Sequence, residues 1–130
     1  RYAVRGGRLP GWVRTVAELL RLTTIIRTKP DGSISLSGFL VGSSKRARRF
    51  GKYVARRAPT DGAIDVTIGH AVCREDAEEL EQAIREQLPG IRKLTVVGIG
   101  TALGVHGGPG TLLVSMMPYL SADDVAAGVD

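Results

Sequence analysis

Cysteine and aromatic residues are scarce in this sequence. Cys73 is the only cysteine among 130 residues, and aromatic residues make up 5% of the chain. A single thiol excludes an intrachain disulfide and a metal site built from several cysteines, and it is typical of a reducing compartment. We therefore expect a cytoplasmic protein whose core consists mainly of Val, Leu, Ile and Ala.

Long apolar runs are missing as well. No run approaches the roughly 18 residues that a membrane-spanning helix needs, and no charged and then apolar leader opens the sequence. The hydrophobic fraction of 43% and the charged fraction of 24% are those of an ordinary globular protein. We expect one soluble domain over residues 1–130, with 121–130 as a flexible tail. Because the first residue is Arg1 rather than Met, we also expect a piece of a longer protein.

Sequence patterns for catalysis and metal binding are weak. No serine lies in a G-x-S-x-G nucleophile motif, and the two histidines, His70 and His106, have no spacing typical of metal ligands. The glycine-rich stretch around His106 lacks the Lys and the Ser or Thr of a P-loop. Hydrolase and metalloenzyme functions are therefore disfavoured.

Positive charge is concentrated in the first half of the chain. Residues 1–57 hold 14 Lys or Arg against two acids, whereas residues 58–130 hold 4 against 11. The segment 45–57 alone carries seven cations and no acid. Such a segment is suited to a negatively charged partner, and nucleic acid, phosphate, an acidic lipid surface and an acidic protein all remain open.

Apolar periodicity and turn residues predict an alternation of helices and strands. Asp31-Gly32 marks the turn of a hairpin, and a serine just before Lys45 is the candidate N-cap of the next helix. The predicted order is a helix over 12–22, a hairpin over 23–41, a helix over 45–57, a strand over 63–72, a helix over 74–88, a strand over 94–100, a glycine-rich loop over 104–111, and a strand or helix over 111–120. This order favours an α/β fold of the α+β kind, with a mixed, partly antiparallel sheet and helices packed on it.

The glycine-rich loop, GVHGGPGT, places four glycines and one proline around His106. Glycine permits positive φ angles and lets a ligand or another backbone come close, while Pro109 restricts one turn. An imidazole on such a loop can donate a hydrogen bond to a carboxylate. From composition alone, a tight connection between strands with a purely structural histidine is the simpler interpretation.

Four stretches, taken in order, resemble the C-terminal half of the DegV family. They are YAVRGGRLPGWVRTVAELLRLTTII, DGSISLSGFLVGSSKRARRFGKYV, GHAVCREDAEELEQAIREQLPGI and VVGIGTALGVHGGPGTLLVSM. The most specific feature is His106 followed by Gly108-Pro109-Gly110; Gly6-Gly7-Arg8, the Asp31-Gly32 turn and the basic helix support it. The resemblance covers residues 2–117.

This resemblance implies a two-domain protein that binds a fatty acid, uses no cofactor and is not an enzyme. One long-chain fatty acid would lie in a tunnel between the domains, with its carboxylate held by hydroxyls of an N-terminal domain and by the loop histidine. Carried over to this chain, the carboxylate site comprises His106, Gly107, Gly108 and Gly110. The apolar residues implied as tunnel wall, each equally suited to an ordinary core, are Leu19, Ile25, Leu103, Leu112 and Met116.

The resemblance also implies a partner, a fatty-acid kinase that phosphorylates the presented acid. Its docking residues here would be Arg46, Arg48 and Arg49, and brief contact with a membrane surface is compatible with this function. Two departures stand out: residue 107 is Gly where relatives often have Thr, and Gly42-Ser43 replaces a frequent Arg-Thr pair. The alternative function is a basic domain that binds a protein or nucleic acid without a small ligand, although the few aromatic residues disfavour nucleic acid.

Overall fold

The structure is a computed structural model that describes residues 22–42, 44–59 and 62–127, with the side chains of residues 102, 103 and 124 left out. All but the last residue of the helix expected over 12–22, and the Gly6-Gly7-Arg8 motif, lie outside the described residues. The fold class expected from the sequence is confirmed, because the described residues form a mixed α/β arrangement of two sheets with helices.

The first sheet is the predicted hairpin, formed by β1 (Thr23–Thr28) and β2 (Ile34–Leu40). The two strands pair antiparallel, with a register shift between Ile25 and Ile26. In the turn, the Ser33 amide donates to the Asp31 carboxylate at 2.9 Å, and Gly32 takes a positive φ of 81°. This turn chemistry explains why an Asp-Gly pair reverses the chain here.

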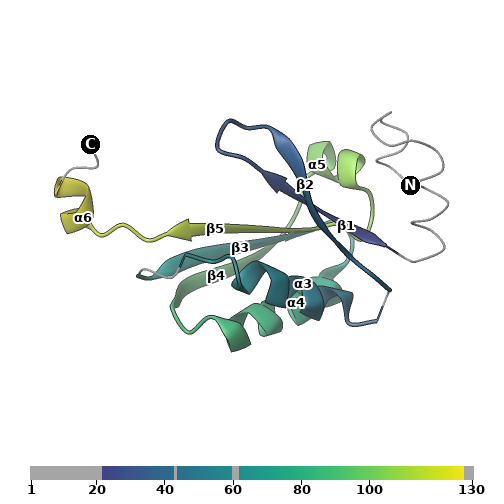
Figure 1. Ribbon diagram of the computed structural model, residues 1–130, viewed down its shortest axis with the longest axis horizontal. Coiled ribbons are helices and arrows are strands. Elements are labelled where there is room, and N and C mark those ends of the chain that lie inside the picture. The colour runs from purple at the N-terminus through teal and green to yellow at the C-terminus, as the bar shows by residue number, and fades with distance from the viewer. Residues whose placement is uncertain (1–21, 43, 60–61, 128–130) are drawn as a thin grey trace.

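The second sheet has three strands in the order β4-β3-β5 (Figure 1). The central strand β3 (Ile64–His70) runs parallel to β4 (Ile91–Gly98) and antiparallel to β5 (Leu112–Pro118). Helix α4 (Arg74–Gln87) makes the crossover between the two parallel strands, as such a connection requires. Residues 112–118, for which strand and helix were both open, form a strand.

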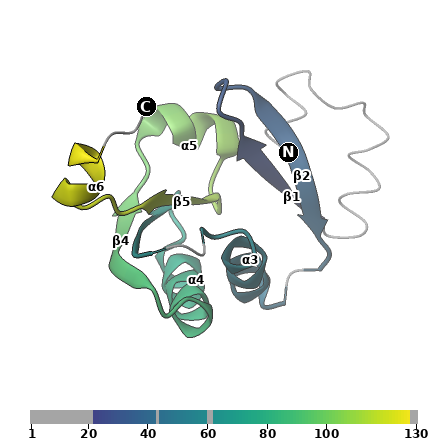
Figure 2. The same cartoon turned by 60° about the vertical axis from the view of Figure 1, so that its left-hand side comes forward.

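Helices α3 (Arg46–Ala55) and α4 lie side by side against one face of this sheet (Figure 2). The core between them is aliphatic, as expected, with Ile64, Val66 and Ile68 of β3 facing Leu80 and Ile84 of α4. Apolar residues at three- and four-residue spacing on α4 point at alternate residues of β3. The helical spacing of α4 and the alternation of β3 therefore place their apolar side chains in the same buried layer.

The start of α3 differs from the prediction. Its N-cap is Lys45, with φ 52° and no side-chain cap, so the expected serine cap is wrong. The helix also ends at Ala55 rather than near residue 57. The chain reaches α3 through a left-handed turn at Lys45, a conformation that costs an L-residue about 1 to 2 kcal/mol, so the rest of the fold must hold it.

The glycine-rich stretch differs more. Residues Thr101–Gly107 form a short helix, α5, and only residues 108–111 form the loop before β5. A further short helix, α6 (Ala122–Ala126), lies within the segment expected to be a flexible tail. Glycine disfavours a helix, so composition pointed away from α5. The helix lies on the opposite side of the sheet from α3 and α4 (Figures 1 and 2).

One apolar surface is exposed in the described part of the chain. On the sheet face away from α3 and α4, Val97 and Met117 are exposed, but residues of β3, among them Asp65 and Thr67, lie between them, so they form no continuous apolar patch. The outer face of the hairpin exposes a cluster in which Ile26 pairs with Leu36 across the strands, with Ile34 and Phe39 beside them. Contiguous exposed apolar residues of this kind mark surfaces that another body covers.

The contact of α3 with α4 generates a prediction. A Cβ added at Gly51 would lie 2.7 Å from Ala83 Cβ, whereas a Cβ at Gly104, also in a helix, would meet none of the described atoms within 4 Å. We expect Gly51→Ala to destabilise the fold by about 1 to 3 kcal/mol through overpacking. Gly104→Ala should instead stabilise by up to about 1 kcal/mol through helix propensity. Urea unfolding of both variants checks this, and equal effects would contradict it.

Candidate functional site

The candidate site is the turn from α5 into β5, which carries His106. The α5 helix ends when the Gly108 amide donates to the Gly104 carbonyl at 2.7 Å. Gly108 and Gly110 then take φ angles of 79° and 86°, in the region that favours glycine. These two glycines reverse the chain within four residues, and the His106 side chain is left exposed at the end of the helix.

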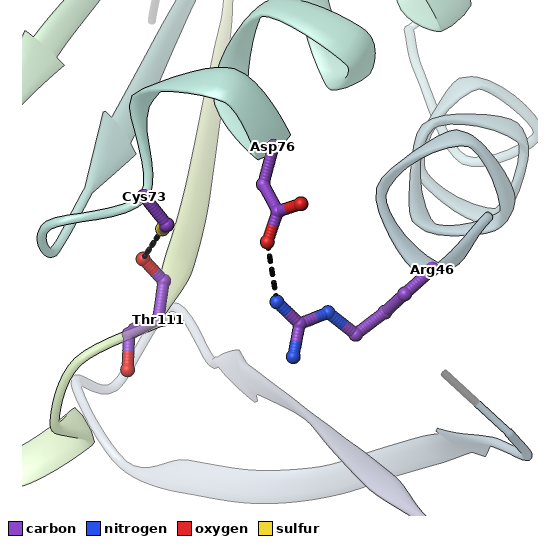
Figure 3. Close-up of polar contacts among 4 residues, drawn as sticks. All are labelled: Arg46, Cys73, Asp76 and Thr111. Carbon is purple, nitrogen blue, oxygen red and sulfur yellow. Dashed lines mark hydrogen bonds and ion pairs between the residues drawn. The ribbon is translucent and has the colours of Figure 1, made fainter. Parts of the chain in front are cut away.

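The loop is fastened to the end of β3 by main-chain hydrogen bonds. The Gly110 amide donates to the Ala71 carbonyl at 2.8 Å, and the Ala71 amide donates back to the Thr111 carbonyl at 2.9 Å. The Cys73 thiol also points at the Thr111 carbonyl, at 3.5 Å (Figure 3). The segment that follows β3 therefore determines where the His106 loop lies.

Gly107 is a glycine for a steric reason. It lies in α5 and is not among the residues with a positive φ. A Cβ added there would lie 2.9 Å from Thr111 Cγ2 and closer still to the Thr111 hydroxyl oxygen. The side chain of Thr111 thus fills the space beside Gly107, one residue from His106.

Next to this loop lies an open hollow of about 480 Å³, lined by His70 and by residues 72–76. His70 Nδ1 is buried and has no hydrogen-bond partner among the described residues. Val72 takes a positive φ of 53° at the rim, an unusual conformation for a β-branched residue. His106 is not part of this lining, so the two histidines belong to different surfaces.

Cys73 lies between the hollow and the loop. Burial raises the pKa of its thiol above the ordinary value, and the nearby Asp76 carboxylate acts in the same direction. The neutral thiol is therefore favoured, which suits its role as a weak donor to the Thr111 carbonyl.

The predicted docking arginines are largely occupied within the protein. Arg46 forms an ion pair with Asp76 of α4 at 2.5 Å, and Arg48 forms one with Glu86 at 2.5 Å (Figure 3 shows the first). Arg49 donates to the Gly42 carbonyl at 3.1 Å. The acids that pair with this helix come from α4, 30 and 38 residues later in the chain. The sequence of segment 45–57 by itself therefore could not reveal these ion pairs.

Fewer cations of α3 are consequently free for a partner. Within the described ranges, the side chains of Lys45, Lys52 and Arg56 are exposed and form no ion pair. Arg57 stacks on the Tyr53 ring, 3.7 Å from its centre. A phosphate-binding face of seven cations, as nucleic acid would use, is therefore reduced to a smaller patch.

The predicted tunnel residues have different environments. Leu112 and Met116 pack against the core between the sheet and helices α3 and α4. Ile25 is buried, 6% exposed, in the hairpin. Leu19 lies outside the described residues, and the Leu103 side chain is not described. Of the three tunnel residues whose side chains the structure describes, Leu112 and Met116 therefore lie at the core and Ile25 lies in the hairpin.

The sequence matches a known protein family. The model of a family described as "Uncharacterised protein, DegV family" matches residues 1–118. The chain belongs to the DegV family. The resemblance expected from the sequence is confirmed, and the His106 loop lies within the matched range.

Individual DegV relatives agree. A DegV domain-containing protein of Clostridium perfringens is 30% identical over 115 residues, covering 88% of this chain and 40% of that protein. A crystal structure described as a fatty acid binding DegV family protein from Streptococcus agalactiae has TM-score 0.71 and 23% identity, covering 92% of this chain and 41% of that one. A DegV family protein from Eubacterium eligens, loaded with heptadecanoic acid, has TM-score 0.66 and 17% identity, covering 89% and 41%. The two crystal structures share the fold, and this chain spans about two fifths of each relative.

No group of three or more metal-ligating side chains occurs among the described residues. In the same ranges, no helix has the length and apolar character needed to cross a membrane.

The link between α3 and α4 can be measured. We expect Arg46→Gln and Asp76→Asn each to destabilise the fold, and the double variant to lose less than the sum of the two. A coupling of about 0.5 to 1 kcal/mol is expected for a pair that is about one third exposed. A double-mutant cycle by urea unfolding at low and high salt checks this. Strict additivity of the two losses would contradict the pairing.

Proposed function

We propose that this protein binds a long-chain fatty acid and that His106 receives the carboxylate. The observation that carries the proposal is the exposed imidazole in the last turn of α5, beside the glycine loop, in a chain that belongs to the DegV family. Solved structures with the same fold include one described as fatty acid binding and one loaded with heptadecanoic acid. The activity is binding and presentation, without a cofactor.

The chemistry of the loop suits a carboxylate head group. The His106 imidazole donates a hydrogen bond through a ring N–H. Gly108 and Gly110 add no side chain, so an oxygen can come close to the backbone between α5 and β5, and beside Gly107 it would meet the Thr111 side chain. The main-chain bonds from Ala71 keep this loop in place before a ligand arrives, which reduces the ordering cost of binding.

We further propose that residues 1–130 form one domain of a two-domain, cytoplasmic protein. The exposed apolar face of the hairpin supports this proposal, because among the described residues nothing covers it and a second domain would do so. The acyl chain would lie between the domains. Ile25, Leu19 and Leu103 remain candidates for its wall. Leu112 and Met116 are suited to the wall only if the acyl chain reaches the core they pack in.

The bound acid would then be presented to a fatty-acid kinase, which phosphorylates it. Three exposed cations in α3 and at its ends, Lys45, Lys52 and Arg56, support docking of an acidic partner surface. Arg46, Arg48 and Arg49 would contribute only by exchanging their present partners, Asp76, Glu86 and the Gly42 carbonyl.

His106 gives the first test of the proposed function. In the complete protein, including whatever sequence precedes these residues, His106→Ala should weaken heptadecanoic acid binding about tenfold or more, because one hydrogen bond to a charged group is lost. Isothermal titration calorimetry measures the affinity. Val105→Ala is the matched control, since Val105 is the exposed neighbour in α5, and it should bind normally. A wild-type protein that takes up no fatty acid would exclude the function itself.

Kinase docking gives a separate test. Lys52→Glu/Arg56→Glu should reduce formation of the acyl phosphate by a fatty-acid kinase several-fold and leave fatty-acid affinity unchanged, because only the docking surface changes sign. The matched control is Arg74→Glu/Arg85→Glu, which alters net charge equally at exposed sites on α4. Equal inhibition by both double variants would indicate a general charge effect and contradict docking on α3.

A further inference from the structure

The Thr111 hydroxyl has no role in the function proposed above. Contacts of its main chain nevertheless fix the position of this residue. The Thr111 amide donates to the Gly108 carbonyl at 3.2 Å. Its carbonyl accepts from the Ala71 amide at 2.9 Å and from the Cys73 thiol at 3.5 Å, and Figure 3 shows the second of these contacts. Three contacts on the main chain therefore determine where the side chain projects.

The Thr111 side chain projects toward Gly107. The space that a Cβ of residue 107 would fill is taken by the Thr111 hydroxyl and methyl groups. Thr111 is half-buried, and among the residues the structure describes its hydroxyl forms no hydrogen bond. The hydroxyl oxygen is not among the buried side-chain atoms that lack a partner, so it is open to solvent and can bind a ligand that reaches the loop.

We propose that the Thr111 hydroxyl is a second ligand of the carboxylate, acting together with His106. The proposal rests on the fatty-acid-binding function above and names a further residue of that site. A carboxylate accepts several hydrogen bonds, so the imidazole N–H and the Thr111 hydroxyl can be donors to the same head group. Gly107 is then the partner of Thr111, since only a residue without a Cβ leaves this hydroxyl in its position.

The absence of a hydroxyl at position 107 fits this assignment. Gly107 has no side chain that could donate, and the hydroxyl beside it comes from residue 111. The donor would thus come from the loop side of the turn rather than from α5 itself.

The decisive comparison is Thr111→Val against Thr111→Ser in the complete protein. Valine keeps the shape and removes the hydroxyl, so heptadecanoic acid should bind about tenfold more weakly, as expected for one hydrogen bond to a charged group. Serine keeps the hydroxyl and should bind within about twofold of wild type. A role of Thr111 in packing alone predicts the opposite order, because serine loses the methyl group and valine does not.

A second comparison does not change Thr111 itself. Gly107→Ala should push the Thr111 hydroxyl away and weaken binding, whereas Gly104→Ala, in the same helix with open space around it, should not. Thermal unfolding without ligand identifies any variant that fails to fold, and in that case Gly107→Ala and Thr111→Ser carry the test.

The outcomes separate the two proposals. If wild type binds heptadecanoic acid, His106→Ala weakens binding and Thr111→Val does not, the Thr111 inference is overturned while the proposed function stands. If wild type binds no fatty acid, the proposed function fails, and the inference that rests on it fails too. Weakened binding in Thr111→Val with normal binding in Thr111→Ser supports both.

Discussion

The central strand β3 is the element on which the rest of the structure depends. It pairs with β4 on one side and β5 on the other, and its Ile64, Val66 and Ile68 side chains form the floor of the core under α3 and α4. The residue after its end, Ala71, bonds to both Gly110 and Thr111. β3 therefore contributes to the hydrophobic core and also positions the candidate ligand loop. A change in the packing of β3 would consequently shift the loop next to His106.

The two helices on this strand are joined in two ways. Close packing at Gly51 against Ala83 brings their axes together, and the ion pairs of Arg46 with Asp76 and of Arg48 with Glu86 link their polar sides. The basic helix is thereby part of the architecture as well as a surface. This double use explains why its cations cannot all be available to a partner, and why the exposed residues Lys45, Lys52 and Arg56 are better suited to docking.

The hairpin has an exposed apolar face. Its Ile26, Leu36 and Phe39 side chains have no cover among the described residues. This chain spans about two fifths of its DegV relatives. In the function that we propose, a second domain over this face would enclose the acyl chain, while His106 and Thr111 would bind the head group from this side.

Local patterns in the sequence determined several elements by themselves. Asp31-Gly32 specified the hairpin turn, and the apolar spacing at Ala77, Leu80 and Ile84 specified α4, because turn chemistry and helical periodicity act over a few residues. The His106 motif pointed to the family. The tertiary structure alone decided the rest: α5 forms despite its glycines, Arg46 meets an acid 30 residues away, and Thr111 fills the space beside Gly107. These features depend on contacts between segments that folding brings together, and no local propensity encodes such contacts.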